Sequence, residues 1–234
     1  MAKAFAEWTV LNHGELVQVQ ENLWLIEGEI PKMSLRRRMT VARQDNGALL
    51  MHNPIALDEE TIAQVEALGP VFYIIVPNGW HRLDAPSFRK RYPETIVLCP
   101  WGALKKVEQV VEVGGSYNEF PDDEKISLQH LRGMNEAEGV LKVSDGTQST
   151  LIFNDILFNL PKGAGGLMMK IMGSTGGPKV TPMMRMIVIK NKKELRAHLE
   201  ELAQTPGLCR IVPGHGDVIE EGAAGVLRDV AATL

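Results

Sequence analysis

Residues 209–221 read CRIVPGHGDVIEE: a short apolar run ends at a proline, and two glycines then flank a single histidine, His215. Glycine on both sides removes the steric cost of an unusual backbone and lets the imidazole point away from the chain. The pattern predicts a strand that ends in a tight turn and presents one histidine. Two interpretations stay open for that histidine, a site residue or a partner of a neighbour within an ordinary turn.

The composition is that of a globular protein and narrows the classes of partner. The chain has 234 residues, of which 44% are hydrophobic and 23% charged, so it can build a sizeable core. The formal net charge is −4 with both signs mixed, and the one basic run is SLRRRMT at residues 34–40. We therefore expect neither a nucleic acid nor a membrane as partner.

No stretch has the length of a membrane span, and the first residues lack the apolar core of a signal peptide. We expect a cytoplasmic protein. Cys99 and Cys209 lie inside apolar runs, TIVLCP and LCRIVP, rather than in a zinc-type spacing. Their positions favour core residues over metal ligands or a disulfide.

Hydrophobic periodicity predicts a mixed α/β chain with hairpins at the start and in the middle. The helix that begins at residue 58 has an acidic first turn, and the one that begins near Asn191 has a capping-box-like start. The expected elements are strands in 16–31 and 38–54 with a turn at 45–47, a helix over 58–69, a buried strand over 71–76, a short helix over 85–93, a buried strand over 95–100, strands in 126–133 and 138–155 with a turn at 145–146, and a helix over 191–204.

A segment rich in glycine and methionine lacks the periodicity of these helices and strands. Residues 160–186 contain six of the eleven methionines among glycines and prolines. Methionine is adaptable and common at surfaces that repack. Three interpretations follow: a loosely packed flap, a mobile lid or a contact for a partner.

Polar side chains follow three of the predicted strands, where layered sheets usually place their sites. His81 and Asp84 follow the strand over 71–76, Asp155 follows the apolar run 151–153, and His215 follows the last strand. A carboxylate just past a buried strand needs a partner or a metal ion. These residues are the candidates for a site.

The order of these motifs resembles the metallo-β-lactamase superfamily over roughly residues 16–230. NDILFN looks like its strand that ends in a metal-bridging aspartate, at Asp155, and IVPGHG looks like its last metal motif, at His215. The segment with Pro-Asn-x-x-His is most similar to an uncharacterised bacterial family of β-lactamase-like proteins. The resemblance implies an α/β fold, a four-layer αββα sandwich, as one domain over residues 1–234 with an insertion or flap at about 161–186.

The chain departs from the superfamily where most metal ligands should lie. Aligning the motif His-x-His-x-Asp-His at Asn78 puts Asn78, Trp80, Arg82 and Leu83 on its four ligand positions. The middle histidine motif falls in LRGMNEAEG, where Met134 replaces histidine and the glutamates at 136 and 138 lie nearby. Only two of the usual ligands are kept by identity.

The residues present suit one metal ion better than two. His81, Asp155 and His215, with Glu138 or Asp84, supply two nitrogens and a carboxylate for one zinc, iron or manganese ion. A second ion would meet the fixed positive charge of Arg82. Such a site implies a hydrolase of a small ester, thioester, lactone or phosphoester, with a water activated by the ion as nucleophile.

The alternative is a protein that keeps the fold and has lost the metal site. His81 would then pair with Asp84, and His215 would hydrogen-bond Asp155 within a non-catalytic cleft that holds a ligand or partner. In both cases we expect a small molecule as substrate or ligand, and a homodimer stays open. Metal content separates the two interpretations.

Overall fold

The computed structural model describes residues 3–121 and 123–234, and the side chains of Leu167 and Met168 lie outside the description. Among the described residues, none of the helices is both long and apolar enough to cross a membrane. The strands are β1 (Val17–Gln20), β2 (Leu23–Glu29), β3 (Arg36–Arg43), β4 (Leu49–His52), β5 (Val71–Ile75), β6 (Ile96–Leu98), β7 (Ile126–His130), β8 (Gly139–Ser144), β9 (Ser149–Ile152), β10 (Phe158–Leu160), β11 (Gly177–Lys179), β12 (Leu208–Val212) and β13 (His215–Gly216). The helices are α1 (Glu59–Glu66), α2 (Ala85–Arg91), α3 (Leu104–Val107), α4 (Gly166–Ile171), α5 (Pro182–Ile187), α6 (Lys192–Leu202) and α7 (Ala223–Ala232), with 3-10 turns η1 (Trp101–Ala103) and η2 (Tyr117–Glu119).

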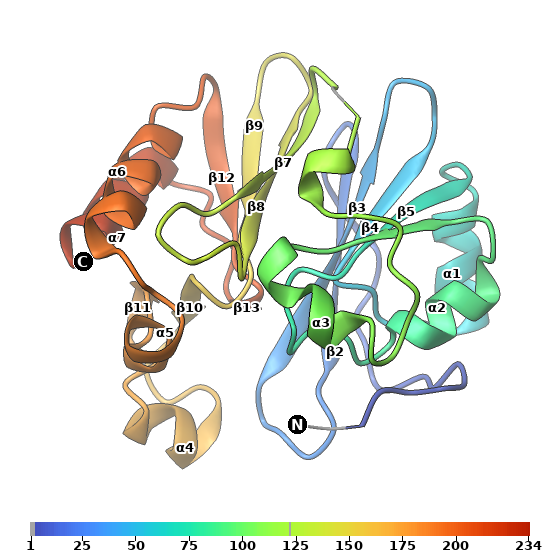
Figure 1. Ribbon diagram of the computed structural model, residues 1–234, viewed down its shortest axis with the longest axis horizontal. Coiled ribbons are helices and arrows are strands. Elements are labelled where there is room, and N and C mark those ends of the chain that lie inside the picture. The colour runs from blue at the N-terminus through green and yellow to red at the C-terminus, as the bar shows by residue number, and fades with distance from the viewer. Residues whose placement is uncertain (1–2, 122) are drawn as a thin grey trace.

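Two sheets lie between two layers of helices (Figure 1). The first has six strands in the order β1-β2-β3-β4-β5-β6, and the second has four in the order β12-β9-β8-β7. Helices α1 and α2 lie beside the first sheet, and α6 and α7 lie beside the second (Figure 1). A small third sheet, β11-β10-β13, continues below the second. This is the expected four-layer αββα sandwich.

Three apolar clusters hold the layers together. The cluster between the sheets contains Leu50 and Ile75 from the first and Leu141 and Ile152 from the second, all buried. A second cluster fills the space between the first sheet and α1 and α2, and a third that between the second sheet and α5, α6 and α7. Because both faces of each sheet are covered, β4 and β9 are buried along their whole length, and β5 is a continuous apolar run rather than an alternating one.

The local signals of the sequence are confirmed in the elements that they predicted. The turn at 45–47 joins the antiparallel strands β3 and β4, and the turn at 145–146 joins β8 and β9. Asp58 caps α1 by accepting from the amide of Thr61, and the Asn191 side chain accepts from the amide of Glu194 at the start of α6. Strand β4 pairs in parallel with β5, and β5 with β6, with a helix in each connection.

The glycine-methionine segment divides into two parts. Helix α4 and strand β11 form a small unit with β10, in which Met169 packs on Phe158 and Leu160. In α5, by contrast, Met184 is fully buried in the cluster of the second sheet. The C-terminal part is therefore core rather than lid, because its methionine side chain is surrounded by residues of α6, α7 and the sheet.

This division predicts different costs for two methionines on one helix. Met184→Ala should lower the free energy of unfolding by about 2–4 kcal/mol, because it leaves a cavity in a packed core. Met186→Ala on the same helix should change it by less than about 0.5 kcal/mol, because that side chain is 83% exposed. Urea unfolding of both variants checks this, and equal effects would contradict the assignment of α5 to the core.

Candidate metal centre

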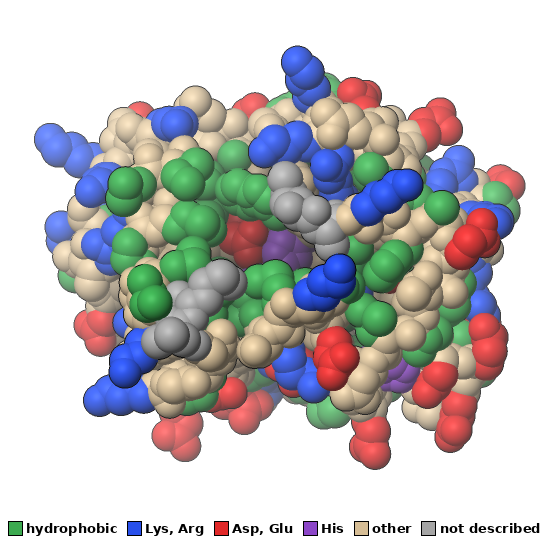
Figure 2. Space-filling model, turned by 90° about the horizontal axis from the view of Figure 1, so that it is seen from below, with side chains coloured by type: hydrophobic (Ala, Val, Ile, Leu, Met, Phe, Trp, Pro, Cys, Tyr) green, Lys and Arg blue, Asp and Glu red, His purple; other side chains and the backbone are tan. Residues whose placement is uncertain are grey.

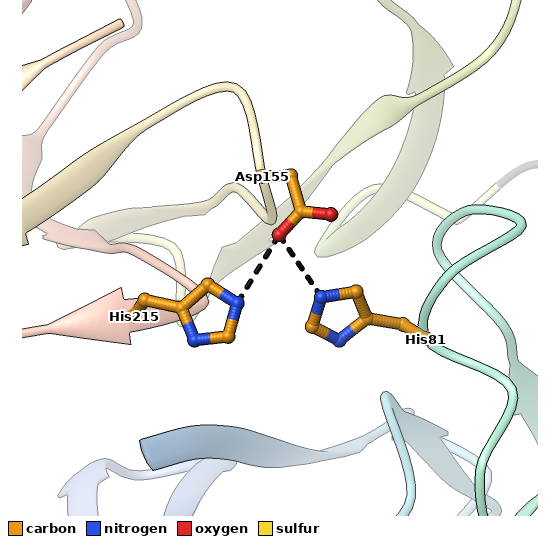
Figure 3. Close-up of side chains that lie close together, drawn as sticks. All are labelled: His81, Asp155 and His215. Atoms are coloured by element: carbon orange, nitrogen blue, oxygen red, sulfur yellow. Dashed lines mark hydrogen bonds and ion pairs between the residues drawn. The ribbon is translucent and has the colours of Figure 1, made fainter. Parts of the chain in front are cut away.

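Three side chains from the ends of three strands meet between the two sheets (Figure 3). His81 lies in the loop after β5, Asp155 in the loop after β9, and His215 in β13 just after β12. One ligand atom from each lies within 4.8 Å of the other two. The structure thus brings together the three residues on which the sequence interpretation relied most.

The two imidazoles share one oxygen of the carboxylate. His81 Nε2 lies 2.9 Å and His215 Nε2 lies 3.1 Å from the same atom, Asp155 Oδ1. The side chain of His215 is 3% exposed, that of His81 9% and that of Asp155 11%. Little water reaches these groups, so whatever lies between them must satisfy the carboxylate.

The other ring nitrogen of His215 is already committed. Its Nδ1 lies 2.6 Å from the backbone oxygen of Arg36 in β3. A carbonyl only accepts, so Nδ1 carries a proton and donates it. In a neutral ring Nε2 then carries a lone pair, which points at Asp155.

His81 is oriented in the same way by an asparagine. Its Nδ1 lies 3.1 Å from Asn53 Oδ1, while the amide nitrogen of Asn53 donates to the carbonyl of Arg38 at 2.8 Å. The second bond fixes which end of the Asn53 amide faces the ring, so Nδ1 of His81 is the donor. Asn53 has a positive φ of 54°, which asparagine tolerates better than most residues. Hydrogen bonds of this kind to the outer nitrogen are typical of histidines that bind metals.

The glycines around His215 are required by close packing. A Cβ at Gly214 would lie 2.6 Å from Asn154 Oδ1, and one at Gly216 would lie 2.1 Å from the backbone oxygen of Asn159. Gly216 also has a φ of +93°, which larger residues rarely adopt. The turn that the sequence analysis singled out lets β13 run tightly beside β10, which places His215 against Phe158 and Asp155.

The second oxygen of Asp155 belongs to a different network. Asn78 donates its amide nitrogen both to Asp155 Oδ2 at 2.9 Å and to Glu138 Oε2 at 3.1 Å. The Asn78 Oδ1 atom accepts from the amides of Trp80 and His81, so its orientation is fixed as well. The backbone N–H of Ile156 donates to the other oxygen of Glu138 at 2.8 Å.

The two carboxyl groups of this network differ in their titration. Burial raises the pKa of Glu138 to about 8, and the neighbouring Asp155 adds to the effect. Burial also works to raise the pKa of Asp155, but the charge and hydrogen bonds of His81 and His215 outweigh it and hold that pKa well below its usual range. Asp155 is therefore ionised in the folded protein.

Asp84 lies elsewhere, and its expected place among the ligands needs correction. Its two oxygens contact Arg37 at 2.5 Å and the amide of Ala56 at 3.3 Å, on the face of the first sheet that packs against helices. Residues 81–84 precede α2 rather than forming part of it, so His81 and Asp84 do not share a helix face. Burial raises the pKa of Asp84, and Arg37 opposes this.

Two other expectations change in the same region. Arg82 turns away from the cluster and donates to the backbone oxygen of Lys106 and to Gln109, so it does not occupy the place of a second ion. Met134 is fully buried in the core of the second sheet. Glu138 contacts Asn78 and Ile156 rather than the two histidines.

Sequence reasoning missed Asn53 as a residue of the site and treated Asn78 only as a lost ligand. Asn53 directly follows β4, the parallel neighbour of β5, and strand-end position was the signal that could have found it. The hydrogen bonds of Asn78 depend on the spacing between the sheets, for which the sequence carries no local signal.

The cluster is reached from one end of the sandwich. Seen from the lower end of Figure 1, carboxylate and histidine side chains form the floor of a hollow, and hydrophobic side chains surround it (Figure 2). Helices α4 and α5 and the β2–β3 connection lie at this end (Figure 1). The site therefore faces solvent through an opening with apolar walls.

Comparison with known proteins supports the fold. A family model described as a domain of unknown function, DUF4336, matches residues 20–103. No curated protein sequence matches the chain. Among solved structures, the chain is similar to the VMB-1 structure with a TM-score of 0.62 and 13% identity, over 94% of this chain and 96% of that one. It is also similar to the metallo-β-lactamase DIM-1, with a TM-score of 0.59 and 12% identity over 95% of this chain and 99% of that one.

The chain has the metallo-β-lactamase fold. A third structure, FIM-1 from Pseudomonas aeruginosa in a mono-zinc form, aligns with a TM-score of 0.60 and 9% identity over 93% of this chain and 94% of that one. These alignments cover nearly the full length of both chains in each pair. Because identity is this low, the likeness concerns the fold and leaves the activity to be argued from the site.

The buried pair of Asp84 and Arg37 predicts a structural role for Asp84. Asp84→Ala should cost about 3–5 kcal/mol, because it leaves the guanidinium of Arg37 buried without a partner. Glu59→Ala breaks an exposed pair with Arg91 and should cost less than about 1 kcal/mol. Chemical denaturation measures both, and a cost for Asp84→Ala no larger than that for Glu59→Ala would argue against this role.

The raised pKa of Glu138 predicts a pH dependence of stability. The folded protein holds this proton more tightly than the unfolded chain does, so the contribution is complete below about pH 4.5 and is lost as the pH rises through about 8. Metal-free protein should lose stability over this window relative to Glu138→Gln, by about 1.4 kcal/mol for each unit of pKa difference. Urea titrations at several pH values test this, and parallel curves for the two proteins would refute it.

Proposed function

We propose that the protein is a metal-dependent hydrolase in which His81, Asp155 and His215 hold one ion. The observation that carries the proposal is the direction of the ring nitrogens. Both Nδ1 atoms donate, to Arg36 O and Asn53 Oδ1, so in neutral rings two Nε2 lone pairs and an ionised oxygen face one point. Three electron-rich atoms that converge need protons or a metal ion between them, and their number and kind suit a metal ion.

The donor set fits the chemistry of a catalytic ion. Two imidazole nitrogens and one carboxylate oxygen are ligands that zinc, iron and manganese accept, and three protein ligands leave a position open. The carbonyl of Arg36 and the amide of Asn53 lie behind the ligands and keep the rings in place. The residues present therefore suit one ion, and they do not select between these metals.

The Asn78 network favours one ion over two. A second ion would need Asp155 Oδ2 and further ligands nearby, but Asn78 already donates to that oxygen and to Glu138. An amide N–H₂ group is a donor and does not bind a cation. This reason replaces the charge of Arg82, which points away from the site.

An ion at this site would lower the pKa of a bound water to near neutrality and polarise a carbonyl or phosphoryl oxygen. The chain itself orients the two imidazoles, keeps Asp155 ionised and leaves the three side chains only 3–11% exposed. Asp155 is supported on its far side by Asn78, so it cannot rotate without breaking that bond. We infer a small ester, thioester, lactone or phosphoester as the substrate.

Metal analysis tests the proposal directly. Protein purified near neutral pH should carry about one zinc, iron or manganese ion per chain by elemental analysis, because deprotonated ligands bind the ion. His215→Ala should lose it, while His13→Ala should keep it, because His13 lies in the N-terminal segment and its ring accepts from the amide of Asp58 instead of joining the cluster. A wild-type protein with less than about a tenth of an equivalent after incubation with each metal would refute the proposal.

The non-catalytic alternative has one observation in its favour. The contacts of 2.9 and 3.1 Å between Nε2 and Asp155 are also those of charged hydrogen bonds from protonated imidazoles. In that case His215→Ala would leave Asp155 with one partner fewer and cost about 3–5 kcal/mol in metal-free protein. His215→Ala also removes a buried ring and its hydrogen bond to Arg36 O under either interpretation, so metal content rather than the melting curve separates the two.

A further inference from the structure

A cleft of about 230 Å³ adjoins the candidate metal centre on the side of Asn78. It lies between the loop after β5, the turn η1, the loop before β8 and the end of α5. The residues that matter for its chemistry are Asn78, Trp80, Lys106, Ile187, Val188 and Lys190. The cleft is outside the triangle of His81, Asp155 and His215, and the activity proposed above does not account for it.

The cleft and the site share a wall. Asn78 lines the cleft and donates to Asp155 Oδ2 at 2.9 Å. Trp80 lines the cleft and directly precedes His81, and both of their amides donate to Asn78 Oδ1. Only the side chain of Asn78 therefore separates a molecule in the cleft from Asp155.

The walls of the cleft are apolar and its margin is positively charged. The indole of Trp80 and the side chain of Ile187, which is 57% exposed, supply most of the apolar surface, and Val188 and Met134 lie behind them. Lys106 Nζ lies 5.1 Å from the centre of the Trp80 ring, and Lys190 Nζ donates to the carbonyl of Ile187 at 3.0 Å. Each contact holds an ammonium group at the cleft and leaves it donors to spare.

These two ammonium groups lack an acidic partner. In the described part of the chain, Lys90 and Lys125 are the lysines that form ion pairs with carboxylates, so Lys106 and Lys190 are unpaired as most lysines are. What distinguishes these two is that both line the same cleft. The formal net charge of the whole chain is −4, whereas the two charged side chains that line this cleft are both positive. A cleft with an apolar wall and two unpaired cations is complementary to a ligand with an apolar body and an anionic group.

We propose that this cleft binds the part of the substrate that does not react, and that it selects a small molecule in which an apolar group carries a carboxylate or a phosphate. The inference rests on the proposed function in one respect: the ligand is a substrate only if the protein is a hydrolase. Binding in the cleft does not require the metal. The Trp80 ring and the exposed side chain of Ile187 contact the apolar body. Lys106 and Lys190 bind the anion, with hydrogen bonds to charged groups that are stronger than neutral ones.

The test follows the indole N–H of Trp80 by NMR, with the signal assigned through Trp80→Phe. Metal-depleted wild-type protein is titrated with three probes: 3-phenylpropionate, phenyl phosphate and the neutral 3-phenylpropanol. We expect a saturable shift with at least one anion and binding of the alcohol weaker by about tenfold or more. The stronger of the two anions identifies the preferred group.

Two double variants with equal charge separate the cleft from general electrostatics. Lys106→Gln with Lys190→Gln should weaken anion binding by about tenfold. Lys105→Gln with Lys192→Gln removes the same charge from neighbouring exposed positions outside the cleft and should leave binding within about twofold. Equal losses in the two double variants, equal affinity for the alcohol, or no saturable shift of the Trp80 signal would each overturn the proposal.

The outcome is independent of the metal assignment. A protein that binds the anions in the cleft but takes up no metal would refute the hydrolase and keep the cleft as a ligand site. A protein with one ion per chain whose Trp80 signal does not respond would refute the cleft and keep the metal centre.

Discussion

Two imidazoles and one carboxylate oxygen converge at a single point between the sheets. The charge that this end of the sandwich must bind or hold depends on their convergence. His81 and His215 approach the same oxygen of Asp155, and each ring has its other nitrogen committed to an acceptor. A buried carboxylate is tolerated only where positive charge compensates for lost hydration. The point between these atoms therefore has to hold protons or a metal ion.

The apolar cluster between the two sheets fixes how closely His81, Asp155 and His215 approach one another. His81 and Asn53 extend from the first sheet, whereas Asp155 and His215 extend from the second. The distance between the two groups depends on the apolar cluster that separates the sheets. Because such interiors are close-packed, the spacing resists change, and side chains at the strand ends keep their positions without much support from their own loops.

The Asn78 network distinguishes this chain from the pattern of metallo-β-lactamases that it resembles. An amide and a buried glutamate lie where the resemblance led us to expect further metal ligands, and they satisfy each other and the far oxygen of Asp155. The polar groups at these positions are thus satisfied by hydrogen bonds rather than left unpaired. The same asparagine separates the candidate metal centre from the cleft beside Trp80, which makes it the common wall of both proposals.

Local signals were enough to predict α1, α2 and α6, the two hairpin turns and the position of His215 and Asp155 after strands, because caps, turns and apolar runs depend on neighbours in the chain. They did not predict α3, α4, α5 or α7. The resemblance of two motifs supplied the four layers. The partners of each polar side chain were beyond the sequence: Asp84 pairs with Arg37 behind the sheet, Arg82 turns away, and Asn53 supports His81. These contacts join residues 27 to 47 positions apart, and only the packing of the sheets decides which face each side chain occupies.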